Sequence, residues 1–212
     1  DFIYTIASKN ALKTLRTRSF YLEIMMEHII DSLLQKLHLS RANLIYSGGG
    51  HCYILMANTE KTRFAVESYM RELNSWLLET FQVSLYAGWG YAVCSANALK
   101  NFPEGSYEEI FRTIGEKISA RKSHRYTPDQ IRMLNTKKYG DYTRECKACK
   151  KITSVDEEGI CPLCNAIRKF SRNILYDEYF TVMSDRSDDA LPLPGECYLT
   201  SDDDGSLKIK MQ

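Results

Sequence analysis

Two Cys-x-x-Cys pairs restrict the folding of this chain more than any other feature. Cys146 and Cys149 form the first pair and Cys161 and Cys164 form the second, with eleven residues between the pairs. Each pair directs two thiolates toward one point, and two such turns on facing hairpins complete a tetrahedral four-sulfur site, which suits zinc. Four protein ligands leave no open position for water or substrate. The sequence therefore predicts a structural zinc ion that folds a module with little core of its own.

The remaining cysteines and the overall charge indicate the cellular compartment and the kinds of partner to expect. Cys52, Cys94 and Cys197 are scattered, and an odd total of seven with one tight cluster favours a reducing compartment over a disulfide framework. The net charge of +1 gives no general reason to expect binding to nucleic acid or a membrane surface. The apolar runs are far shorter than a bilayer span. We expect a cytoplasmic protein with no membrane partner.

A glycine-rich turn is the second informative stretch. Ser47, Gly48, Gly49, Gly50 and His51 separate two strand-like runs, which predicts a tight hairpin because glycine adopts the positive φ that such turns need. Nucleotide cyclases and polymerase-type palm domains carry Gly-Gly-Asp-Asp or Gly-Gly-Asp-Glu on a similar hairpin, where the carboxylates hold a divalent metal beside a triphosphate. Here Gly50 and His51 stand at the acidic positions. The turn favours a palm that positions a nucleotide without supplying the metal, and a plain hairpin without a ligand is the alternative.

The order of predicted elements defines the fold class. It is α+β, with a ferredoxin-like β-α-β-β-α-β palm followed by the four-cysteine module and a short β-rich segment. We expect a palm at 1–125, a helical linker and zinc domain at 126–170, and a β-rich segment at 171–212. The expected strands are 1–6, 43–46, 52–56, 82–94, 179–183, 196–200 and 207–211. The expected helices are 10–37, a second that Asn58 or Thr59 caps and that runs to Phe81, a third opened by a capping box at Ser106, and a fourth opened by Thr127 with Gln130.

Two basic stretches have two possible roles. Lys13, Arg16 and Arg18 lie near the start of the first expected helix, and residues 121–125 follow the third. They are either solvated basic surfaces or contacts to phosphates of RNA or a nucleotide.

The chain resembles a known family in several specific runs. These are residues 1–6, 11–22 and 43–58 with the Gly-Gly-Gly-His turn, and the four-cysteine module followed by Leu-Pro-Leu-Pro at 191–194. They are similar to the large subunit of type III-A (Csm) CRISPR effector complexes. In that family an HD domain, a first palm, a zinc-bearing domain, a second palm with Gly-Gly-Asp-Asp and a helical domain follow one another. The two palms bind ATP and make cyclic oligoadenylates when target RNA is bound, and the subunit is also associated with cleavage of single-stranded DNA.

The resemblance implies a role for each part of this chain. The chain contains neither an HD motif nor Gly-Gly-Asp-Asp, and both ends look cut, so we expect a catalytically silent piece of a longer nucleotidyltransferase. The glycine turn would face the second palm of the same polypeptide and help to hold ATP, with Mg or Mn in the complete protein. The backbone amides of Gly48, Gly49 and Gly50 and the side chains of Ser47 and His51 are the candidate ATP contacts. Further expected partners are other Csm subunits, CRISPR RNA and target RNA.

Two other functions fit the same residues. One is a scaffold or RNA-complex interaction module with structural zinc and no nucleotide role. The other is a stand-alone degenerate cyclase domain that senses a nucleotide.

Overall fold

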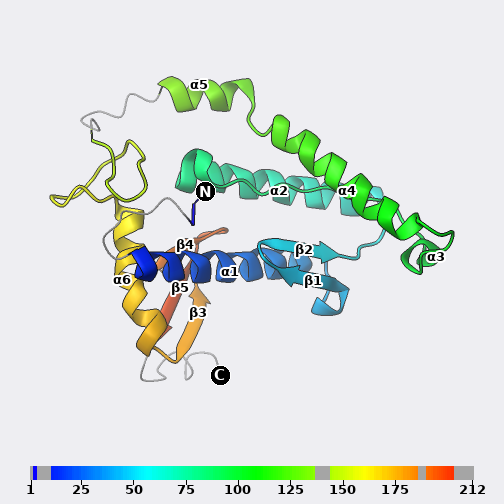
Figure 1. Ribbon diagram of the computed structural model, residues 1–212, viewed down its shortest axis with the longest axis horizontal. Helices are drawn as coiled ribbons and strands as arrows, with labels where there is room; N and C mark the ends of the chain where they lie inside the picture. Colours follow the sequence, from blue (N-terminus) through cyan, green and yellow to red (C-terminus); the bar gives the residue numbers. More distant parts are fainter. Residues whose placement is uncertain (1, 4–10, 137–143, 186–189, 203–212) are drawn as a thin grey trace. The chain divides into compact units, whose positions relative to one another are not determined.

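The computed structural model describes residues 2–3, 11–136, 144–185 and 190–202 (Figure 1). The protein has the α+β composition that the sequence predicts, with small sheets and a four-cysteine cluster. It divides into two compact units, residues 1–55 with 138–212 and residues 56–137. The domain boundaries expected at 125 and 170 remain predictions. No helix in the described part of the chain is long and apolar enough to cross a membrane.

The first unit is built around a long helix, α1 (Ala11–Lys36), which packs against α6 (Pro162–Tyr176) and β4 (Leu191–Leu193). Figure 1 shows α6 crossing α1 close to the start of α1. An antiparallel sheet in the order β3-β5-β4 completes this core, with β3 at Tyr179–Met183 and β5 at Cys197–Asp202. The most deeply buried apolar side chains of the core come from all three parts: Tyr21, Ile30, Ile167, Phe170, Leu191, Leu193 and Leu199.

The predicted hairpin is confirmed within this unit. After a 3-10 turn at Arg41–Asn43, β1 (Leu44–Gly48) pairs with β2 (His51–Ile54) in antiparallel register. Gly48 lies opposite His51, so Gly49 and Gly50 alone form the loop. Their φ angles are 58° and 77°. Positive φ at both central residues is the requirement of a type I′ turn, whose twist matches that of the paired strands.

The second unit is helical. It contains α2 (Glu60–Phe81), a 3-10 turn at Gln82–Ser84, α3 (Ala96–Leu99), α4 (Ser106–Ser123) and α5 (Pro128–Thr136). The expected caps at the starts of α2 and α5 are confirmed, because the hydroxyls of Thr59 and Thr127 accept bonds from Thr62 and Gln130 amides. The capping box at Ser106 is wrong: Gly105, with φ of 85°, is the N-cap and Ser106 is already helical.

The expected strand at 82–94 is also wrong. Residues 85–94 form no sheet pairing; instead the side-chain amide of Asn74 in α2 accepts from Ala87 N at 2.9 Å and donates to Ala87 O at 3.1 Å. The Asn74 side chain thus makes the two backbone hydrogen bonds that a neighbouring strand would make to Ala87 in a sheet. A Cβ built on Gly90 would lie 2.9 Å from the carbonyl oxygen of Ile114, so the glycine lets this segment lie directly on α4.

The β-rich segment after the cysteines is confirmed in part. Strands at 179–183 and 196–200 correspond to β3 and β5, whereas β4 and α6 were not predicted. The sequence does contain a helical pattern for α6: Pro162 stands at the first helical position, and apolar residues follow at 163, 167, 170 and 174. The strands expected at 1–6 and 207–211 fall outside the described residues, apart from Phe2 and Ile3, which form a turn.

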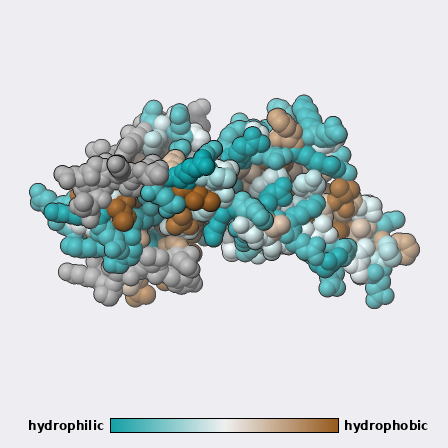
Figure 2. Space-filling view, turned by 90° about the horizontal axis from the view of Figure 1, so that it is seen from above, coloured by the Kyte–Doolittle hydropathy of each residue, from teal (hydrophilic) through white to brown (hydrophobic). Residues whose placement is uncertain are grey.

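The surface drawn in Figure 2 is mainly hydrophilic, with separate brown areas between the teal ones. Exposed large apolar side chains are spread over several elements, among them Phe64, Phe102 and Tyr176. Scattered residues of this kind are ordinary on a protein surface.

Candidate functional site

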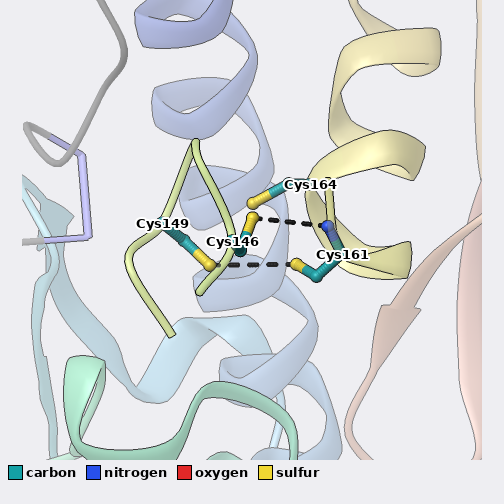
Figure 3. Close-up of side chains that lie close together, drawn as sticks. All are labelled: Cys146, Cys149, Cys161 and Cys164. Atoms are coloured by element: carbon teal, nitrogen blue, oxygen red, sulfur yellow. Dashed lines mark hydrogen bonds between the residues drawn. The ribbon is translucent and has the colours of Figure 1, made fainter. Parts of the chain in front are cut away.

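The four cysteines of the two Cys-x-x-Cys pairs converge on one point. Figure 3 shows their side chains facing one another, and their sulfur atoms all lie within 4.8 Å of each other. The Sγ atoms of Cys149 and Cys161 are 3.8 Å apart. A tetrahedral zinc site with Zn–S bonds of about 2.3 Å separates its sulfurs by about 3.8 Å. All four are free thiols, so the geometry fits a closed four-thiolate metal centre.

The two pairs come from different kinds of structure. Cys146 and Cys149 lie in a loop closed by the bridge between Glu145 and Ile152. Cys161 is the N-cap of α6, and Cys164 lies in the first turn of that helix. The expectation of two facing hairpins is therefore wrong for the second pair. A helix start brings Cys161 and Cys164 to one side because residues three apart share a helix face.

Hydrogen bonds from this module hold three of the sulfurs. The amide of Cys161 donates to Sγ of Cys146 at 3.3 Å. The backbone amide of Lys151 donates to Cys149, and that of Cys164 donates to Cys161. Backbone donors of this kind stabilise thiolates, which are the form that binds metal.

The thiols also affect one another's protonation. The hydrogen bonds from Cys161 and Cys164 lower the pKa of the Cys149 thiol, and the same bonds raise the pKa values of Cys161 and Cys164. Metal binding requires thiolates, so a divalent ion displaces the thiol protons when it binds.

Hydrogen bonds of Asp156 position the second cysteine pair. Asp156 accepts from the amide of Ile160 at 2.9 Å and, through its other oxygen, from Asn165 Nδ2 at 2.9 Å. Asn165 belongs to α6. The carboxylate therefore ties the loop that leads to Cys161 to the helix that carries Cys164.

Two cations lie beside the cluster. Arg18 of α1 is only 1% exposed, and its Nη2 donates to Cys164 Sγ at 3.9 Å. Burial lowers the pKa of Lys151, while the negative charges of Cys149, Cys161 and Cys164 act in the opposite direction. Both expectations for Arg18, a solvated surface or a phosphate contact, are wrong because the residue is buried. Arg16 is exposed, so a solvated surface and a phosphate contact both remain predictions for it.

The glycine turn lies in the same unit, and the structure shows which parts of it are accessible. No atom lies within 4 Å of a Cβ built on Gly49 or Gly50, so the backbone of both is open to an approaching group. The exposed ring of His51 interacts through Nδ1 with Gly49 O at 3.0 Å. Ser47 is half-buried and donates to Glu27 of α1 at 3.0 Å. The turn is therefore anchored at Ser47 and accessible at its tip.

The second basic stretch is partly engaged by aromatic rings of the helical unit. The guanidinium of Arg121 lies 3.8 Å from the ring centre of Trp89, and that of Arg125 lies 5.5 Å from that of Tyr126. Such cation–π contacts fix the side chains on the surface. Contact of this stretch with phosphates remains a prediction.

Comparison with known proteins places these features in one family. The family described as Csm1 subunit domain B matches residues 1–137. A relative from Mycobacterium tuberculosis (strain ATCC 25618 / H37Rv), named CRISPR system single-strand-specific deoxyribonuclease Cas10/Csm1 (subtype III-A), is 44% identical over 94% of this chain and 27% of its own length. The chain spans about a quarter of the length of the curated relatives it matches.

Two solved structures are similar as well. An apo Csm1-Csm4 cassette superposes with a TM-score of 0.69 at 21% identity, over 96% of this chain and 24% of that one, which shows a shared fold. A Csm1-Csm4 cassette in complex with cA3 gives a TM-score of 0.51 at 27% identity, over 64% of this chain and 18% of that one.

Proposed function

This chain belongs to the Csm1 family of type III-A CRISPR large subunits, and we propose that it acts there as the palm that positions ATP without binding the catalytic metal. The observation that carries the proposal is the type I′ turn at Gly49 and Gly50. Its backbone is open to a ligand, and the turn contains no carboxylate.

The chemistry of the turn suits a phosphate better than a metal ion. Glycine lets a triphosphate approach backbone amides closely, and a side chain at Gly49 or Gly50 would cover that surface. His51 can donate to a phosphate oxygen, with charge if protonated. The Ser47 hydroxyl, already bound to Glu27, holds the turn on α1 and can still accept a hydrogen bond. The metal, Mg or Mn, would be held by carboxylates of a second palm in the complete polypeptide.

The proposal includes a product for the complete protein, cyclic oligoadenylates made from ATP. The cA3 complex of a similar Csm1-Csm4 cassette supports this product. In this proposal CRISPR RNA and target RNA control the reaction, and other Csm subunits hold the palm in the effector. The four-cysteine centre binds zinc and has a structural role, since all four positions are occupied by protein.

The decisive experiment compares three variants of the full-length subunit in its assembled effector. Gly49→Asn keeps a type I′ turn, because Asn-Gly is favoured there, but it adds a side chain over the proposed phosphate site. We expect this variant and His51→Ala to melt like the wild type and to make cyclic oligoadenylates at least about tenfold more slowly, the equivalent of about 1.4 kcal/mol. Gly115→Ala in α4 is the control, since no atom lies within 4 Å of its added Cβ. Unchanged synthesis in both turn variants would refute the proposal.

A second function is favoured by the assemblies seen in the similar structures. Both contain Csm1 together with Csm4, so the chain is equally suited to be a non-catalytic interaction module. Calorimetry with ATP and assembly with purified Csm4 distinguish the two. Assembly without ATP binding, in a protein that retains the second palm, would favour the scaffold function.

A further inference from the structure

Cys164 receives a hydrogen bond from a side chain that lies outside the cysteine module. The Sγ of Cys146 accepts from a backbone amide of the module itself, whereas the Sγ of Cys164 accepts from the guanidinium of Arg18 at 3.9 Å. Arg18 lies 146 residues earlier in the chain, on α1. This contact therefore links the core helix to the metal module.

Arg18 is held firmly in this place. Its Nη1 donates to Phe2 O at 2.7 Å, and its guanidinium carbon lies 5.0 Å from the centre of the Phe2 ring. The planar fork of arginine allows Nη1 and Nη2 to bond to two separate groups at once, which a lysine cannot do in the same geometry. These contacts fix the guanidinium in an orientation toward Cys164.

Charge gives this contact its significance. A divalent ion with four thiolates carries two net negative charges, and a buried charge is unfavourable unless it is compensated. Arg18 on α1 places one buried positive charge beside this centre, so it offsets part of the negative charge of the thiolates.

We propose that Arg18 is a positioning residue of the metal centre: its buried guanidinium orients Cys164 and compensates part of the charge of the four thiolates, so that metal binding and the packing of α1 on α6 stabilise each other. This inference rests on the zinc centre proposed above. It makes zinc a stabiliser of the core from which the hairpin projects, because α1, α6, the cysteines and the hairpin belong to one compact unit.

The test measures metal binding by the purified chain. Zinc affinity is determined by competition with a chromophoric chelator, and the cobalt-substituted protein is examined by absorption spectroscopy. We expect Arg18→Met to weaken zinc binding by about 10- to 100-fold, as is typical when a donor to a metal ligand is lost. The cobalt–thiolate charge-transfer band should move to lower energy, because an unsupported thiolate is oxidised more easily. Arg16→Met, an exposed change on the same helix, should leave both unchanged.

Each outcome bears on a separate claim. Zinc affinity and a cobalt band like those of the wild type in Arg18→Met would overturn the role of Arg18. If Arg18→Met does not fold, Arg18→Lys takes its place, because lysine keeps the positive charge but not the planar fork. We expect its zinc affinity and the energy of its cobalt–thiolate band to lie between those of the wild type and of a chain without the contact. Wild-type values of both would overturn the inference. A wild-type chain that binds neither zinc nor cobalt would instead refute the metal centre itself.

Discussion

The hydroxyl of Ser47 donates a hydrogen bond of 3.0 Å to Oε1 of Glu27, which joins the turn end of the glycine hairpin to the middle of α1. The other oxygen of Glu27 accepts from Arg41 at 2.7 Å, and Arg41 also binds both oxygens of Asp31. These ion pairs are exposed and contribute little by themselves. Their effect is geometric: together with the Ser47 bond, they hold the 3-10 turn at Arg41–Asn43 and the end of β1 against the helix.

Glu27 also acts on the neighbouring thiol of Cys52. Burial raises the pKa of Cys52, and the charge of Glu27 raises it further. Glu27→Ala should therefore lower this pKa and free the hairpin, so Cys52 is alkylated faster at pH 8 and amides of residues 44–54 exchange hydrogen faster. Mass spectrometry of labelled peptides measures both. Glu23→Ala, on an exposed turn of the same helix, is the matched control. Equal rates in the two variants would contradict this anchoring role.

Tyr21 gives the core a dependence on alkaline pH. Its buried hydroxyl donates to the carbonyl of Pro192 in β4, and burial raises the pKa of the phenol. A group whose pKa is raised by folding stabilises the protein below its unfolded pKa, about 10 for tyrosine, and that contribution declines as the pH rises further. Tyr21→Phe should lose about 1 kcal/mol near neutral pH.

Denaturant unfolding of the wild type and of Tyr21→Phe at a series of pH values isolates the contribution of the Tyr21 phenol to stability. The difference in unfolding free energy between wild type and variant should shrink above about pH 10, because only the wild type loses this contribution there. Tyr176→Phe changes an exposed ring and should not alter the profile. A difference that stays constant up to pH 11 would show that Tyr21 does not cause the alkaline loss.

Asn74 should be more important than a polar helix residue usually is. Asn74→Ala leaves both the amide and the carbonyl of Ala87 without this partner, at a cost of about 1 kcal/mol. Asn74→Asp keeps the acceptor for Ala87 N but cannot donate to Ala87 O, so its thermal midpoint should also fall. Asn97→Ala, on the exposed helix α3, serves as the control. A midpoint for Asn74→Ala equal to that of the control would argue against the pairing.

Removal of the metal should destabilise the first unit. Elemental analysis should find about one zinc per chain. Chelation or Cys146→Ser should lower the melting temperature and expose residues 144–164 to proteolysis, since the module has little other core. Cys94→Ser, outside the cluster, should retain the metal and the wild-type melt. A metal-free chain that melts like the wild type would exclude a structural role for zinc.

Local chemistry explains why some features were predictable. Gly49 and Gly50 between strand-like runs identify the hairpin, because a type I′ turn needs positive φ at both positions and glycine adopts it without strain. The caps at Thr59 and Thr127 and the strands β3 and β5 depend on neighbours a few residues away, so short patterns identify them. The segment at 85–94 has a strand-like composition, but its backbone partner is a side chain of α2, which no local pattern encodes.

The sequence by itself determined the α+β class, the pairing of the four clustered cysteines and the glycine turn, because spacing and backbone preference act over a few residues. Only the tertiary structure decided what surrounds them. Arg18 was assigned to a solvated or phosphate-binding surface because charge favours exposure, yet it is buried where α1 meets the cysteine module. A buried cation is stable only if compensating groups converge on it from distant parts of the chain, and the fold brings Cys164 and Phe2 to that place.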